Sequence, residues 1–201
     1  MSKSIVLHQT FSDIYFIHHY IPVRDFSYNS KEDVDFSREL WDYKKLSPYA
    51  MEKYTDELMQ AISQLSRNIS KNKIGLVAVP PSKVDKESAV RNSIRIIKEW
   101  YDKGLVKKKY GCDKQIYDYS DLLSRIEDIP TSHESRNRPS YDDQMDSIAC
   151  SRDRLWRYRT AFIILDDVTT LGTSMDVCRD ILIENEADED QIYRLALAKT
   201  K

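Results

Sequence analysis

Two adjacent carboxylates, Asp166 and Asp167, stand between an apolar run and a turn that is rich in hydroxyl groups. The run from Phe162 to Leu165 is typical of a buried parallel strand, and open α/β sheets bind their ligands at the carboxyl ends of such strands. The chain then reads Val-Thr-Thr-Leu-Gly-Thr-Ser, and a helical pattern begins at Ser174. Backbone N–H groups at a helix start, together with hydroxyl donors, bind anions. The order of these residues predicts a phosphate site.

The carboxylates narrow the class of ligand. Two negative charges beside a phosphate repel it unless they bind hydroxyl groups or a cation, and a phosphorylated sugar supplies the hydroxyl groups. Gly172 allows the backbone to approach the ligand closely. An ordinary strand-loop-helix connection with an Asp-Asp cap explains the stretch less well, because a cap needs only one acidic or hydroxyl residue.

This stretch resembles the motif with which type I phosphoribosyltransferases bind phosphoribosyl pyrophosphate (PRPP). Four mostly apolar residues are followed by two acidic residues and a hydroxyl-and-glycine loop. The resemblance implies that Asp166 and Asp167 are catalytic and hold the ribose 2- and 3-hydroxyls. It also implies that the 5-phosphate is bound by Thr169, Thr170, Leu171, Gly172, Thr173 and Ser174. Leu171 stands where most members carry Thr or Ser, so one side-chain donor is missing.

A second part of the resemblance lies earlier in the chain. Residues 73–80 form a dense apolar run that predicts the first buried strand, and the prolines that follow force a loop. The resemblance assigns the pyrophosphate leaving group to Pro81, Ser82 and Lys83, with Lys83 catalytic, and to Arg136 and Arg138 in a mobile loop that closes over the ligand. A solvated surface loop is the alternative for Lys83, and disorder without function is the alternative for the loop that holds Arg136 and Arg138. Mg²⁺ is expected mainly through PRPP, and no residue is assigned to it directly.

Within the superfamily the chain is most similar to the ComF branch of competence proteins. The residues that carry this similarity are Val-Pro-Pro-Ser-Lys at 79–83, Arg91 with Asn92, and Ala-Leu-Ala-Lys-Thr at 196–200. The cysteine-rich zinc module that is typical of ComF proteins is absent from this sequence.

Strands that alternate with helices predict an α/β fold with a parallel sheet. With the resemblance, the expected fold is the three-layer, Rossmann-like type I phosphoribosyltransferase fold with a small N-terminal hood. Residues 1–72 are expected to form the hood and a packing helix, and residues 73–201 the core. The expected strands are 14–21, 73–80, 115–117, 161–168 and 191–200. One helix is expected to start at Pro48, and three others are expected over 90–101, 119–126 and 174–184. The expected loops are 27–38 and 130–147.

The composition limits the function classes. The chain has 201 residues, of which 41% are hydrophobic and 32% are charged, and its formal net charge is -2. It therefore gives no global reason to expect nucleic acid. A basic run before the motif strand, with Arg152, Arg154, Arg157, Arg159 and Trp156, leaves nucleic acid or a protein partner open, although an exposed approach to a strand is favoured. No run approaches the roughly 20 apolar residues that span a bilayer, so we expect a cytoplasmic protein without membrane contact.

The function expected from these features is transfer of a 5-phosphoribosyl group from PRPP to a nitrogen acceptor, such as a nucleobase, with release of pyrophosphate. Two alternatives remain. One is a binding protein that senses PRPP or a nucleotide and has lost efficient transfer. The other is a subunit of a nucleic-acid-processing or defence complex. The resemblance implies that a variable hood, here residues 1–48, recognises the acceptor, and a homodimer is left open.

Overall fold

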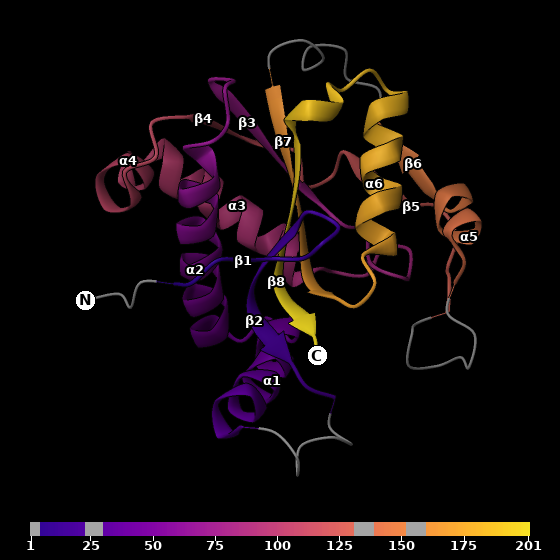
Figure 1. Ribbon diagram of the computed structural model, residues 1–201, viewed down its shortest axis with the longest axis horizontal. Coiled ribbons are helices and arrows are strands. Elements are labelled where there is room, and N and C mark those ends of the chain that lie inside the picture. Colours follow the sequence, from indigo (N-terminus) through magenta and orange to yellow (C-terminus); the bar gives the residue numbers. More distant parts are fainter. Residues whose placement is uncertain (1–4, 23–29, 131–138, 152–159) are drawn as a thin grey trace.

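The computed structural model describes residues 5–22, 30–130, 139–151 and 160–201. A six-stranded sheet forms the centre of the molecule (Figure 1). Every neighbouring pair is parallel except the first, β1–β2. The strands, in their order across the sheet, are β1 (His8–Gln9), β2 (Ile14–Tyr20), β8 (Ile192–Thr200), β7 (Thr160–Thr169), β3 (Lys73–Ala78) and β4 (Gln115–Asp118). The expectation of an α/β fold with a mainly parallel sheet is confirmed.

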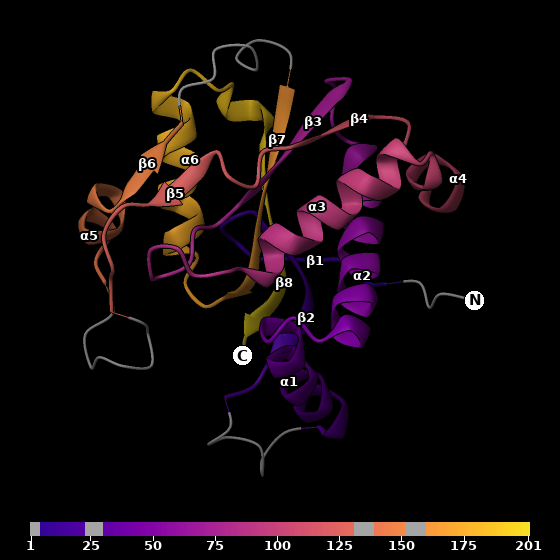
Figure 2. The same cartoon turned by 180° about the vertical axis from the view of Figure 1, so that it is seen from behind.

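Helices cover both faces of the sheet, which gives three layers (Figures 1 and 2). One face carries α2 (Pro48–Ser66), α3 (Ala89–Asp102) and α4 (Leu105–Tyr110). The other carries α6 (Thr173–Glu184), α5 (Tyr141–Asp146) and a small antiparallel pair, β5 (Leu123–Arg125) with β6 (Ile148–Cys150). A short 3-10 turn, η3 (Glu189–Gln191), leads into β8. An apolar cluster lies on each face of the sheet. Ile163 and Leu165 belong to the cluster on the α2 face, and Phe162 and Ile164 belong to the cluster on the α6 face. Because β7 is buried on both faces, its apolar run is continuous.

The N-terminal region contributes to the sheet itself. β2 pairs in parallel with β8, so the sheet does not begin at Lys73. The expected boundary at residue 72 does not divide the core, because Ile17 and Leu40 share one apolar cluster with Ile163. The part that resembles a hood is α1 (Lys31–Lys44), which lies beside the carboxyl ends of β2 and β8 (Figure 1).

α1 corrects the expected loop at 27–38, of which residues 27–29 lie outside the described residues. The helix begins at Lys31 and is capped by Ser30, whose side chain accepts a hydrogen bond from the N–H of Asp33. Its buried residues include Val34, Ser37 and Leu40, at three-residue spacing. Only one face of α1 is covered, so most of its residues are polar, and the segment therefore looked like a loop in the sequence.

Two other expectations were wrong. Residues 119–126 form a turn and β5 in place of a helix, because Leu123 and Arg125 are buried while Ser124 is exposed, as a strand requires. Within the expected loop 130–147, α5 forms behind a reciprocal cap between Ser140 and Asp143. Along the described ranges, no helix combines the length and apolar character needed to cross a membrane.

Candidate functional site

The two carboxylates lie where the sequence predicted, near the carboxyl end of β7 at the centre of the sheet. β3 is a direct neighbour of β7, and the N–H of Val79 extends this pairing by donating to the carbonyl of Leu165 at 2.9 Å. The loop that follows β3 and the loop that follows β7 therefore leave the same edge of the sheet. This edge is the place where open α/β sheets bind ligands.

Asp167 is paired with a residue that sequence reasoning missed. The Nζ of Lys44 lies 3.1 Å from the Oδ1 of Asp167. Lys44 is in the last turn of α1, so the helix at the carboxyl edge brings an ammonium group to the motif. Burial alone would lower the pKa of Lys44, but the carboxylates of Asp167 and Asp166 raise it above its ordinary value.

Asp166 is in a different environment. Its Oδ1 accepts a hydrogen bond from the backbone N–H of Asp167 at 2.8 Å. Because neighbouring strand residues point to opposite faces, Asp166 shares the α6 face with Ile164, while Asp167 faces α1. Burial, and then the charge of Asp167, raise the pKa of Asp166 to about 8. The ionised form of Asp166 is therefore costly without a ligand that donates hydrogen bonds to it.

This raised pKa predicts a pH-dependent stability. Between pH values of about 4 and 8, folded Asp166 holds a proton that the unfolded chain has lost, so the free energy of unfolding falls as the pH rises. We expect the Asp166→Asn variant to lack this loss. Urea unfolding of both proteins across this range measures it, with Asp146→Asn, an exposed position, as the control. A wild-type curve that runs parallel to the Asp166→Asn curve would contradict the assignment.

The loop after β7 presents a row of backbone donors. Within the described ranges, the N–H groups of Leu171, Gly172, Thr173 and Ser174 have no hydrogen-bond acceptor. Gly172 caps α6 with a φ of 90°, and its carbonyl accepts from the N–H groups that follow, including that of Met175 at 2.9 Å. Four successive free N–H groups at the start of a helix form a ready site for an anion.

The side chains of this loop are only partly available. The hydroxyl of Thr173 has no hydrogen-bond partner in the described part of the chain, and Thr170 is exposed with its hydroxyl 3.0 Å from that of Thr200. The Ser174 hydroxyl donates to Gln144 at 2.6 Å, so its proton is already used. Thr169 is 4% exposed, and we assign its side chain no ligand contact. Leu171 is 71% exposed, at the position where a hydroxyl donor is missing.

The loop after β3 holds the other expected residues. Lys83 is exposed and has no carboxylate partner among the residues that the structure describes. The N–H groups of Ser82 and Lys83 likewise have no acceptor there, whereas Pro81 has no N–H to offer. The described geometry thus leaves two amides and one ammonium group free for an anion beside the carboxyl end of β3.

Arg125 holds this loop in place and was not found from the sequence. It is 6% exposed, and its guanidinium donates to the carbonyls of Pro81 at 3.0 Å and Pro80 at 3.4 Å and to the hydroxyl of Ser147 at 2.5 Å. Burial lowers its pKa. Within the described ranges these partners are all neutral, so a buried positive charge lies under the loop without a carboxylate to offset it.

Some expected residues cannot be placed. Arg136 and Arg138 lie outside the described residues, as does the basic run from Arg152 to Arg159. Across the described ranges, no three His, Cys, Asp or Glu side chains gather as a metal site. The carboxylates of Asp166 and Asp167 nevertheless suit a hard cation such as Mg²⁺, which proteins commonly bind through one or two carboxylates and the phosphates of a substrate.

Comparisons with known proteins add no assignment. A scan against models of protein families gives no match to this chain, and a search of the curated proteins gives none either.

Proposed function

We propose that this protein binds PRPP at the carboxyl end of β7 and transfers its phosphoribosyl group to a nitrogen acceptor. This is the chemistry of the type I phosphoribosyltransferases, whose ComF-like branch the sequence resembles, and the α/β fold with a mainly parallel sheet is compatible with it. The observation that carries the proposal is the row of free N–H groups from Leu171 to Ser174 directly after the carboxylates of Asp166 and Asp167. A phosphate and a pair of vicinal hydroxyls in one small molecule match these two sets of groups.

The two carboxylates face opposite sides of β7, which suits a ribose that lies across the end of the strand. Each hydroxyl would then donate to one carboxylate. The hydrogen bonds would favour the ionised form of Asp166, whose pKa is raised in the free protein. The ammonium group of Lys44 lies beside the carboxylate of Asp167 and limits the repulsion between the two carboxylates and the phosphates.

The pyrophosphate group would lie beside the loop after β3. The free amides of Ser82 and Lys83 and the Lys83 ammonium stabilise the negative charge that develops on the leaving group. Arg125 fixes the carbonyls of this loop on the opposite side, so the amides keep their direction. When bound with PRPP, Mg²⁺ neutralises phosphate charge. Most of the rate gain would come from position and charge.

A second function is favoured by Leu171. This exposed side chain replaces a hydroxyl donor at the phosphate, and a protein that only senses PRPP tolerates such a loss more easily than an enzyme does. The sensor would bind PRPP with the same dependence on Asp166 and Asp167 but would release no pyrophosphate. The described residues include no observation that favours a subunit of a nucleic-acid-processing or defence complex.

The Lys83→Ala variant tests transfer against sensing. For an enzyme, a screen of purine, pyrimidine and related acceptors with PRPP releases pyrophosphate only with Mg²⁺. Lys83→Ala should then slow release more than it weakens binding of ribose 5-phosphate, because its charge acts on the leaving group. Lys86→Ala, in the same exposed loop, is the control. PRPP binding without pyrophosphate release from any acceptor would identify the sensor, and no PRPP binding would refute both.

A further inference from the structure

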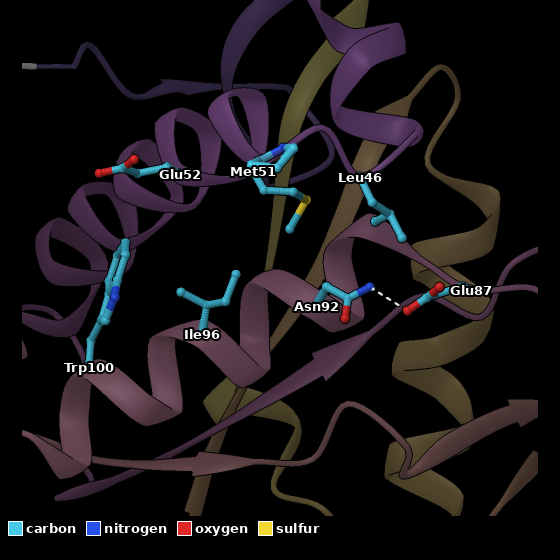
Figure 3. Close-up of a pocket in the computed structure, with 8 residues that line it drawn as sticks. Leu46, Met51, Glu52, Glu87, Asn92, Ile96 and Trp100 are labelled. Atoms are coloured by element: carbon cyan, nitrogen blue, oxygen red, sulfur yellow. Dashed lines mark hydrogen bonds between the residues drawn. The ribbon is translucent and has the colours of Figure 1, made fainter.

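A pocket of about 520 Å³ lies between α2 and α3, with its walls drawn in Figure 3. None of its lining residues is assigned to PRPP, although Glu87 lies in the same loop after β3 as Ser82 and Lys83. Five lining residues are apolar and three carry carboxylate or amide groups: Leu46, Pro48, Met51, Ile96 and Trp100, and Glu52, Glu87 and Asn92. Pockets of this size and lining commonly bind small molecules.

The two carboxylates lie toward opposite ends of the pocket, and Met51 and Ile96 lie between them. Figure 3 shows Met51 and Ile96 pointing toward each other across the middle, Glu52 on the side of Trp100, and Glu87 at the opposite end. Asn92 and Trp100 are separated by eight residues on α3, which corresponds to roughly 12 Å along the helix axis. The pocket is therefore an open, elongated groove with apolar residues in its middle and a carboxylate toward each end.

Neither carboxylate is neutralised by the residues that the structure describes. Glu52 has no ion pair or hydrogen bond there, and Glu87 has only the hydrogen bond from the Nδ2 of Asn92 at 3.1 Å. The cations on the neighbouring helices are engaged elsewhere: Lys53 with Glu39, Arg91 and Arg95 with Asp121, Lys98 with Asp102, and Lys103 with Glu99. The charge that complements this pocket is thus positive at both ends.

We propose that the pocket binds an alkyl diammonium compound of the polyamine class. The hydrocarbon chain would lie along Met51 and Ile96, where it gains from the burial of apolar surface. One ammonium group would donate to Glu52 beside the ring of Trp100, and the other to Glu87. A monoamine meets only one of the carboxylates, and a diol of the same length meets both without a charge. The ligand class follows from the two charges and the apolar spacer that separates them.

The experiment titrates the whole protein, without PRPP, with cadaverine, spermidine and the monoamine pentylamine. Calorimetry gives the dissociation constants. We expect cadaverine and spermidine to bind at least about tenfold more tightly than pentylamine, because a second charge-assisted hydrogen bond forms. Glu52→Gln and Glu87→Gln should each weaken diamine binding by about tenfold or more and leave pentylamine less affected.

Glu99→Gln is the matched control, because Glu99 is exposed on the same helix and does not line the pocket. It should leave diamine binding unchanged. An equal loss in Glu99→Gln would show general attraction of cations and would overturn the proposal, as would equal affinity for cadaverine and pentylamine. A lysine-containing peptide that binds more tightly than any diamine would instead assign the pocket to a protein partner. None of these outcomes depends on PRPP binding.

Discussion

The double variant Asp166→Asn with Asp167→Asn should fold and bind PRPP roughly a hundredfold to ten-thousandfold more weakly than the wild-type protein. Each ribose hydroxyl loses a charged acceptor, and a hydrogen bond to a charged group contributes about 1.5–3 kcal/mol. The fold should persist, because burial already raises the pKa of Asp166 and its ionised form does not stabilise the free protein. Calorimetry with PRPP measures the affinity, and near-UV circular dichroism checks the fold.

The direction of this effect separates the ribose assignment from simple electrostatics. Removing negative charge near a phosphate would by itself strengthen the binding of PRPP, so a weaker affinity points to lost hydroxyl contacts. Asp142→Asn with Asp146→Asn, at two exposed positions of α5, makes the same two chemical changes at carboxylates that the proposal does not place at the ribose, and should have little effect. Tighter binding of PRPP by the double variant at Asp166 and Asp167 would show that these carboxylates only repel the ligand.

Gly172→Val should abolish the binding of ribose 5-phosphate and lower the free energy of unfolding. Gly172 has a φ of 90°, which costs a residue with a side chain about 1–3 kcal/mol. A Cβ at this position would also lie 2.4 Å from the Cδ1 of Ile14, which is buried, and such overpacking costs about 1–3 kcal/mol more. Urea unfolding measures the stability, and calorimetry at a temperature where the variant is folded measures the binding.

Three further variants separate the effects of backbone strain, of the contact with Ile14 and of the loop's phosphate contacts. Gly104→Val meets the same kind of backbone strain at a φ of 71° with no atom within 4 Å of its Cβ, so it measures the strain alone. Ile14→Val deletes Cδ1 and should make Gly172→Val less costly than in the wild-type background. Leu171→Thr restores a hydroxyl donor at an exposed position and should tighten binding of ribose 5-phosphate. If Leu171→Thr weakens binding in a folded protein, the loop does not align with the family motif.

The sequence by itself determined the parts of the fold that depend on local pattern. The apolar run of β7, the carboxylates behind it and the start of α6 near Ser174 were all predicted within a residue or two. These features can be predicted from the sequence because a strand that is buried on both faces must be apolar throughout, and because the chain must turn before a helix can begin. The positions of β3 and α2 followed from the same kind of evidence.

Only the tertiary structure decided which distant residues meet at the site. Lys44 reaches Asp167 because β2 pairs with β8 and carries α1 to the carboxyl edge of the sheet, and no local pattern encodes that pairing. Arg125 lies in a segment that looked helical, and its burial under Pro80 and Pro81 arises from the packing of β5 against the loop. The pocket between α2 and α3 is likewise formed by two helices that the intervening β3 holds side by side. Local periodicity records which face of an element is buried, whereas the partner that buries it is chosen by packing over the whole chain.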